Sequence, residues 1–194
     1  MGKLNGVLVA EVLSDLEYFK YTSQADINAV KMEIVKGFDD GRILCTANLE
    51  EKPYTPLCYR LYGCDAESLF EMGGITTHLE YIEPTFKKLS IPLIWKDDLI
   101  SDDLMEHTIT INDKMYYAFK GDATKMNSWA WAVRNFIEII NDQLSLYNSD
   151  ERLYPIGGEG GMVFLTDNQF KYMSTHFSKM EGPMDMTSWW QIEN

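Results

Sequence analysis

The feature that most constrains the fold is an apolar stripe between about Thr124 and Tyr147. Its residues recur at the spacing of one helix face: Trp129, Val133, Phe136, Ile137, Ile140, Leu144 and Tyr147. Arg134, Glu138 and Asp142 lie off this stripe, as expected for a solvated side. Trp131 and Ile139 also lie off it, which indicates a second, partly covered face. The pattern predicts one long helix that packs at the centre of the protein.

Two hairpins are predicted around this helix. His107–Ile111 and Lys114–Phe119 flank the turn-forming pair Asn112-Asp113, and Arg152–Ile156 and Met162–Leu165 flank a glycine-rich stretch. Short apolar runs on either side of turn residues are typical of antiparallel strand pairs.

A further hairpin is predicted earlier in the chain. Apolar and polar residues alternate over Ile27–Val35 and over Arg42–Leu49, and Phe38–Gly41 supplies a turn between them. This alternation places Cys45 on the apolar face of the second strand. Leu57–Tyr62 is predicted to be a third strand.

Short helices are predicted where a capping residue precedes a helical pattern. The first is a helix from Ala66 to Met72 capped by Asp65, followed by a capping box at Thr77–Glu80 and a further helical piece from Pro84 to Leu89. The others are a short helix over Asp102–Glu106 capped by Ser101 and a helix from Asp167 to about Phe177 capped by Thr166. Hairpins and helices in this order predict a single α+β domain over residues 1–194.

The stretch Gly157-Gly-Glu-Gly-Gly161 invites interpretation as a phosphate-binding loop. Such a loop requires a following lysine and hydroxyl at a helix start, whereas a strand-like run, Met162–Leu165, follows here. Glu159 would also bring negative charge to the place of a phosphate. The stretch is therefore predicted to be a structural turn whose glycines adopt positive φ angles.

The charge balance limits the classes of partner. Seventeen basic and thirty acidic residues give a net charge of −13. Binding to nucleic acid or to an anionic membrane surface is therefore not expected, because both rest on Lys and Arg. No run approaches the roughly 20 apolar residues of a membrane span, and no signal peptide is recognised, so a cytoplasmic location is expected.

No catalytic, cofactor or metal signature is found. The histidines and carboxylates lack the spacing that places several ligands around one ion, and the three cysteines (Cys45, Cys58 and Cys64) form neither a paired metal motif nor a disulfide framework. An enzyme that uses a cysteine and a histidine brought together in space stays an open alternative.

The acidic run from Lys96 to Glu106 is the candidate partner-binding segment. It contains the carboxylates of Asp97, Asp98, Asp102, Asp103 and Glu106. A helix or tight turn there would bring several like charges to one side, which favours a basic partner more than it favours stability. Asp39 and Asp40, in the turn of the first predicted hairpin, are expected to extend this surface. A solvated edge is the alternative.

The C-terminal part of the chain carries a resemblance. The long helix Ser128–Leu146, the stretch Glu151–Gly158 and the run Met162–Phe170 together resemble bacterial immunity proteins, the inhibitors of polymorphic toxins from contact-dependent or type VI systems. The resemblance implies an acidic protein without cofactor that binds one cognate toxin domain, a nuclease or another enzyme. A regulatory protein of a phage or mobile element that acts on a host protein is the rival interpretation.

Overall fold

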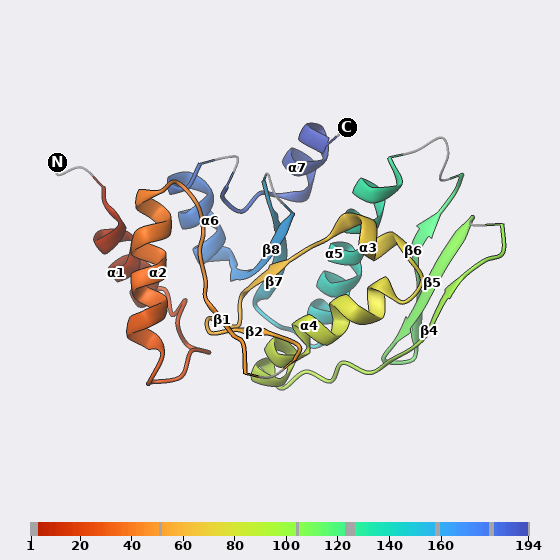
Figure 1. Ribbon diagram of the computed structural model, residues 1–194, viewed down its shortest axis with the longest axis horizontal. Coiled ribbons are helices and arrows are strands. Elements are labelled where there is room, and N and C mark those ends of the chain that lie inside the picture. The colour runs from red at the N-terminus through yellow and green to blue at the C-terminus, as the bar shows by residue number, and fades with distance from the viewer. Residues whose placement is uncertain are drawn as a thin grey trace.

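The computed structural model describes residues 4–50, 52–103, 105–122, 127–157, 160–178 and 181–193. Within these residues the chain has an α+β fold with seven helices and three antiparallel sheets. The elements are arranged in successive layers along the long axis of the molecule (Figure 1).

The first layer consists of helices at the N-terminal end of the long axis: α1 (Gly6–Asp15), α2 (Ile27–Asp39) and α6 (Asp167–His176). Beside it lies the sheet β3–β8–β7, formed by β3 (Leu61–Gly63), β8 (Gly161–Thr166) and β7 (Glu151–Ile156). Between α2 and β3 in the sequence, β1 (Ala47–Asn48) and β2 (Thr55–Pro56) form a short two-stranded ladder.

The next layer covers the opposite face of the β3–β8–β7 sheet. It contains α3 (Ala66–Phe70), α4 (Gly74–Leu89), α5 (Ser128–Leu146) and α7 (Met186–Glu193). The sheet β4–β5–β6, formed by β4 (Trp95–Ile100), β5 (Glu106–Ile111) and β6 (Lys114–Lys120), closes the far end of the molecule.

Two hydrophobic cores share the β3–β8–β7 sheet. Met162 and Phe164 of β8 pack into the core built on α4 and α5. The alternate residues Val163 and Leu165 pack into the core built on α1, α2 and α6. Because successive side chains of a strand point to opposite faces, this one continuous apolar strand joins both cores.

The prediction of a long central helix is confirmed by α5. The side chains of Val133, Phe136, Ile137, Ile140 and Leu144 are buried, and buried Ile139 shows that a second face is also covered. The side chain of Trp129, at the first turn, is 52% exposed. The proposed start at Thr124 lies outside the described residues, and Asn127 caps the helix with its side-chain oxygen.

Both later hairpins are also confirmed. β5 and β6 pair across Asn112-Asp113, whose positive φ angles of 48° and 63° fit a tight hairpin turn. β7 pairs with β8 in register from Glu151–Thr166 to Ile156–Gly161. In the turn between them Gly160 has a φ of 68°, whereas Gly158 and Glu159 lie outside the described residues.

The hairpin predicted over residues 27–49 is wrong. Residues 27–39 form α2, because Val30, Ile34 and Gly37 lie on one helical face and are buried together. Positions 30 and 34 share a face in a strand as well as in a helix, so they do not distinguish the two. Met32 distinguishes them, because a strand would bury it beside Val30 and its side chain is 72% exposed.

Three predicted helix starts are also wrong. α4 runs through Pro84 without ending, and Thr77 lies inside it rather than at its cap. Pro84 has no N–H, so the carbonyl of Glu80, four residues earlier, lacks its helical hydrogen-bond donor. Glu80 is exposed, so water can donate to this carbonyl instead. Ser101 does not start a helix but closes the turn between β4 and β5 by accepting the N–H groups of Met105 and Glu106. The predicted caps at Asp65 and Thr166 are confirmed, the latter as a capping box.

Candidate functional site

The β4–β5–β6 sheet presents an uncovered face at the end of the molecule (Figure 1). Its inner residues, among them Ile109, Ile111 and Ala118, belong to the core against α4 and α5. Its outer residues include Leu99 and Tyr117, which flank Thr108 across the three strands, and Met115 opposite Thr110. Their side chains are exposed by 59%, 42% and 54% for Leu99, Tyr117 and Met115. We call these three residues, with the carboxylates Asp97, Asp102, Asp103 and Glu106, the acidic sheet face.

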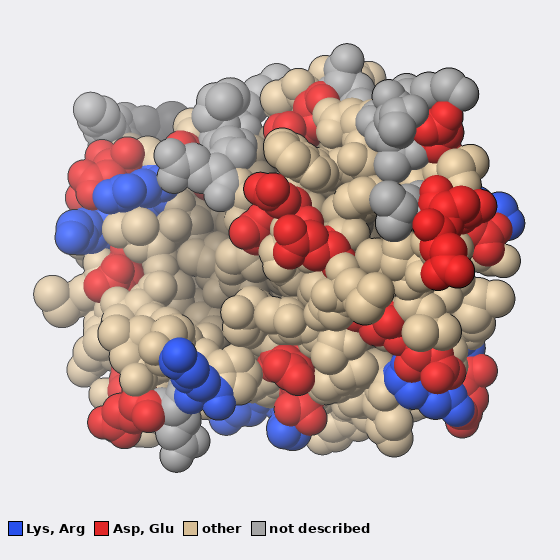
Figure 2. Space-filling view, turned by 45° about the vertical axis from the view of Figure 1, so that its right-hand side comes forward, with Lys and Arg blue, Asp and Glu red and all other residues tan. Residues whose placement is uncertain are grey.

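Four of the seven predicted partner-binding residues lie together on the acidic sheet face. Asp97 occupies a bulge in β4 with a φ of 58°, Asp102 and Asp103 lie in the turn before β5, and Glu106 begins β5. Figure 2, in which this end of the molecule is turned toward the viewer, shows acidic side chains gathered on it. The expected clustering thus arises from a bulged hairpin and not from a helix.

The charges of this face do not cancel. Among the described residues Asp97 and Asp102 form no hydrogen bond or ion pair through their side chains. Asp103 accepts from its neighbours in the chain, the Ser101 hydroxyl at 2.6 Å and the Met105 N–H at 3.1 Å, and these hydrogen bonds lower the pKa of its carboxyl group. The lysines nearby are already paired: Lys96 with Asp113, Lys114 with Asp142 and Lys120 with Glu106.

Asp98 takes no part in this exposed surface. The bulge turns it inward, where its carboxylate lies 2.6 Å from Nε2 of His107 and accepts the Thr76 N–H at 3.0 Å. Burial alone would raise the pKa of Asp98, but these two hydrogen bonds outweigh it and lower the pKa. Asp98 therefore joins β4 to β5 and to the start of α4, which is a structural role.

Asp39 and Asp40 lie far from the acidic sheet face. They end α2, at the opposite end of the molecule (Figure 1). Asp39 accepts the N–H of Gly6 at 3.1 Å, and Asp40 lies 4.0 Å from Arg42. The structure therefore does not bring these two carboxylates to the surface that they were expected to extend.

A recess of about 1,020 Å³ that no sequence pattern predicted lies between the two cores. Its walls include the aromatic residues Tyr54, Tyr62, Tyr81 and Trp189 and the carboxylates Asp65, Glu181 and Glu193. No lysine or arginine is found among the described residues that line it. Figure 2 shows this hollow on the face toward the viewer, with acidic side chains beside it. Walls from β3, α4, α7 and the β7–β8 turn meet only in the fold, so no local sequence signal indicates the recess.

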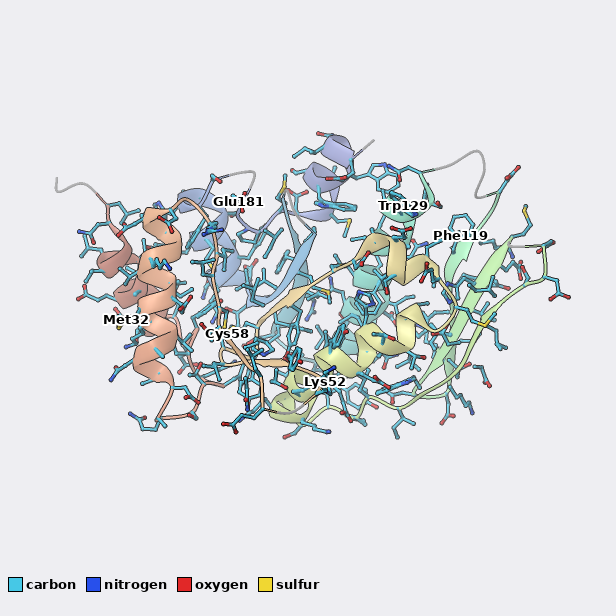
Figure 3. The ribbon with its side chains drawn as sticks, viewed as in Figure 1. Met32, Lys52, Cys58, Phe119, Trp129 and Glu181 are labelled. Carbon is cyan, nitrogen blue, oxygen red and sulfur yellow. The ribbon has the colours of Figure 1, made fainter. Side chains whose placement is uncertain are left out.

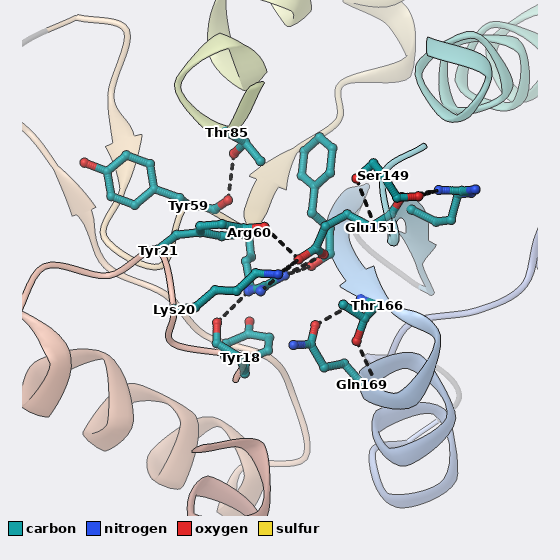
Figure 4. Close-up of polar contacts among 12 residues, drawn as sticks. Tyr18, Lys20, Tyr21, Tyr59, Arg60, Thr85, Ser149, Glu151, Thr166 and Gln169 are labelled. Atoms are coloured by element: carbon teal, nitrogen blue, oxygen red, sulfur yellow. Dashed lines mark hydrogen bonds and ion pairs between the residues drawn. The ribbon is translucent and has the colours of Figure 1, made fainter. Parts of the chain in front are cut away.

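A buried ion pair joins Arg60, just before β3, to Glu151 at the start of β7 (Figure 4). Arg60 and Glu151 have fully buried side chains, and Nη1 of Arg60 lies 2.8 Å from Oε2 of Glu151. Arg60 also donates to the carbonyls of Tyr18, at 2.5 Å, and Phe164, at 2.8 Å.

Glu151 links this ion pair to the N-terminal segment. It accepts from the Tyr21 hydroxyl at 2.9 Å and lies 3.1 Å from the Lys20 ammonium. Burial alone would raise the pKa of Glu151, but Arg60 and Lys20 outweigh burial and lower it. The network therefore fastens the segment after α1 to the β3–β8–β7 sheet.

The cysteines and histidines show no nucleophile–base pair within the described residues. Burial raises the pKa of the Cys64 thiol to about 12, the opposite of an activated thiolate. His78 on the recess wall uses Nδ1 to contact the carbonyl of Gly74, and His107 is paired with Asp98. Cys45 is half-buried outside any strand, which corrects its predicted position on a strand face.

The described residues contain no cluster of three or more histidine, cysteine or carboxylate side chains placed to hold a metal ion. Across the same residues no helix has both the length and the apolar character to cross a membrane.

No protein-family model matches the chain, and no significant match is found among curated proteins or solved structures.

Proposed function

We propose that the protein is an immunity-type inhibitor that binds and neutralises a basic toxin domain through the acidic sheet face. One observation carries this proposal: among the described residues, three carboxylates without a basic partner border an exposed apolar stripe, while Lys96, Lys114 and Lys120 are already paired.

The two parts of the acidic sheet face serve different steps of binding. Carboxylates at the rim of an interface raise the association rate of a basic partner and add little to the energy of the final complex. Aromatic residues and methionine are enriched at the buried centres of interfaces, where they hold the complex together. Tyr117, Met115 and Leu99 supply such a centre, and Asp97, Asp102 and Asp103 supply the rim.

The rival interpretations differ in the partner or in the chemistry. A regulatory protein of a phage or mobile element would use the same surface to bind a host protein, so the identity of the partner separates it from an immunity protein. A cysteine–histidine enzyme would need an activated thiolate within reach of a histidine.

The experiment begins with the protein that the tagged chain captures from its source organism. This step identifies the partner, and the properties of the purified partner then test the proposal. The purified partner should be basic, should be toxic when expressed alone, and should lose its activity when one equivalent of this chain is added. A captured host protein with no toxicity would favour the regulatory alternative and contradict the immunity proposal.

A variant of the stripe tests the surface itself. Leu99→Ala with Tyr117→Ala should weaken binding of the captured partner by about 2 to 4 kcal/mol, as the loss of hot-spot residues does. Met32→Ala is the matched control, because Met32 is also exposed, on α2, and lies at the other end of the molecule (Figure 3). Equal affinities for the stripe variant and the control would place the binding site elsewhere.

A further inference from the structure

Cys45 and Cys58 lie beside each other on neighbouring segments. Ala47 pairs with Pro56 and Asn48 with Thr55, and the Leu57 N–H donates to the Thr46 carbonyl at 2.9 Å. Cys58 follows Leu57 in a turn that the Tyr59 N–H closes by donating to the Pro56 carbonyl at 2.9 Å, so the end of the ladder places Cys58 beside Cys45.

The two thiols already contact each other. The Cys58 N–H donates to Sγ of Cys45 at 3.3 Å, and a hydrogen bond between the two side chains raises the pKa of Cys45. Burial would raise the pKa of Cys58, but this hydrogen bond and the N–H groups of Leu61 and Arg60 outweigh it and lower the pKa. One thiolate can therefore be held between the two sulfur atoms.

The cysteines differ in access. Cys45 is half-buried and lines the recess, whereas Cys58 is fully buried and is not among the residues that line it. The carboxylates of Asp65, Glu181 and Glu193 line the same recess as Cys45, with no basic side chain among its described lining residues. A positively charged reagent is favoured in this recess, and a negatively charged one is repelled.

We propose that Cys45 and Cys58 form a reversible modification site, which a cationic small-molecule disulfide entering the recess converts into a disulfide bond. The site stands independently of the proposed function, because it rests on the cysteine pair and on the recess alone.

The exchange proceeds in two balanced steps. The pair loses one proton to solvent, the remaining proton moves to Cys58, and the Cys45 thiolate attacks one sulfur of the small disulfide. One small thiolate leaves, and a mixed disulfide forms at Cys45. Cys58 then gives up its proton and attacks Sγ of Cys45, which releases the second small thiolate. The protein dithiol is oxidised to a disulfide, and the small disulfide is reduced to two thiols.

Oxidation of the native protein with cystamine is the direct test. Free thiols counted after denaturation should fall from three to one, and peptide mapping should find Cys45 joined to Cys58. The cross-link should raise the melting temperature by about 5 to 10 °C, because it closes a short loop in the unfolded chain. Dithiothreitol should reverse both changes. Retention of three thiols, or a link that involves Cys64, would overturn the site.

Two comparisons sharpen the test. Cysteine variants separate the roles: Cys58→Ser should stop at a mixed disulfide on Cys45, and Cys64→Ser, the control, should still form the Cys45–Cys58 bond. The anionic probe, oxidised glutathione, should react about tenfold more slowly than cystamine at low salt, and salt should narrow the difference. Equal rates with the two probes at low salt would overturn the cationic class of the substrate.

Discussion

Replacing Glu151 by glutamine perturbs the buried network at its centre. Glutamine has nearly the same shape as glutamate, so the change removes the negative charge and leaves the packing of β7 intact. Arg60 then keeps its hydrogen bonds to the carbonyls of Tyr18 and Phe164 but loses its counter-ion. The side chain of Arg60 is fully buried, so water cannot replace the carboxylate.

The magnitude follows from that burial. Removing one partner of a buried ion pair costs about 3 to 5 kcal/mol, because an uncompensated charge stays in the interior. This is a large part of the roughly 5 to 15 kcal/mol that stabilises a typical domain. Lys20, whose side chain is 30% exposed, can turn to solvent, so Arg60 is the member of the network left with an uncompensated buried charge.

Urea unfolding at neutral pH measures the effect. With a slope of about 2 kcal/mol per molar urea, the midpoint of Glu151→Gln should fall by about 2 M. Glu138→Gln is the matched control, because Glu138 pairs with Arg134 on the exposed side of α5 with its side chain 52% exposed. Such a surface pair contributes at most about 1 kcal/mol.

The pH dependence gives an independent check. The pKa of Glu151 is lowered in the folded protein from its ordinary value of 4.5. Its contribution to stability is therefore fully present above pH 4.5 and is lost as the pH falls through the lowered value. Because glutamine does not titrate, the gap between wild type and Glu151→Gln should narrow in acid. A loss no larger than that of the Glu138→Gln control, or a gap that stays constant with pH, would refute this reasoning.

Two further substitutions test local features. Asp98→Asn should lower the free energy of unfolding by about 1 to 3 kcal/mol, because it weakens the contact with His107. Asp97→Asn should change the free energy of unfolding by less than about 0.5 kcal/mol. Thermal unfolding compares the two variants, and equal stabilities would show that Asp98 has no structural role. Gly160→Val should destabilise the fold by at least about 2 kcal/mol, because φ is 68° and an added Cβ would lie 2.7 Å from the Cys64 carbonyl oxygen. Gly63→Val is its control, since a Cβ at Gly63 meets nothing within 4 Å, and urea unfolding that gives the same midpoint for both would contradict the strained geometry of the turn.

Periodicity identified the elements that have a long or unambiguous pattern. The α5 stripe extends over several turns, so a helix is the only structure that brings its apolar residues to one face. The β7–β8 and β5–β6 hairpins have turn residues that fit positive φ angles. Over residues 27–39 the pattern was too short, because Val30 and Ile34 satisfy a strand and a helix alike, and tertiary packing against α1 and the sheet decided between them.

The candidate site was partly accessible to sequence reasoning. The clustering of Asp97, Asp102, Asp103 and Glu106 followed from their closeness in the chain. The inward turn of Asp98 did not, because it depends on a β-bulge and on His107 across the ladder. The recess and the Cys45–Cys58 pair are each formed by segments that come together only in the complete fold. No local sequence pattern therefore predicts either of them.

Steering of a basic partner by the carboxylates of the acidic sheet face is the central claim. The most direct test is the association rate of the captured partner, measured at about 0.01 M and 0.15 M salt, where the screening length falls from roughly 30 to 8 Å. Asp102→Asn with Asp103→Asn removes two charges from the face. Glu11→Gln with Asp15→Asn removes two from exposed positions on α1, at the other end of the molecule.

Two charges at about 7 Å from a basic group in water contribute roughly 1 kcal/mol in total. The Asp102/Asp103 variant should therefore associate about five- to tenfold more slowly than wild type at low salt, with a flatter dependence on salt. The Glu11/Asp15 variant should stay close to the wild-type rate. If the two variants slow association equally, only the net charge of the protein matters, and the acidic sheet face is not where the partner docks.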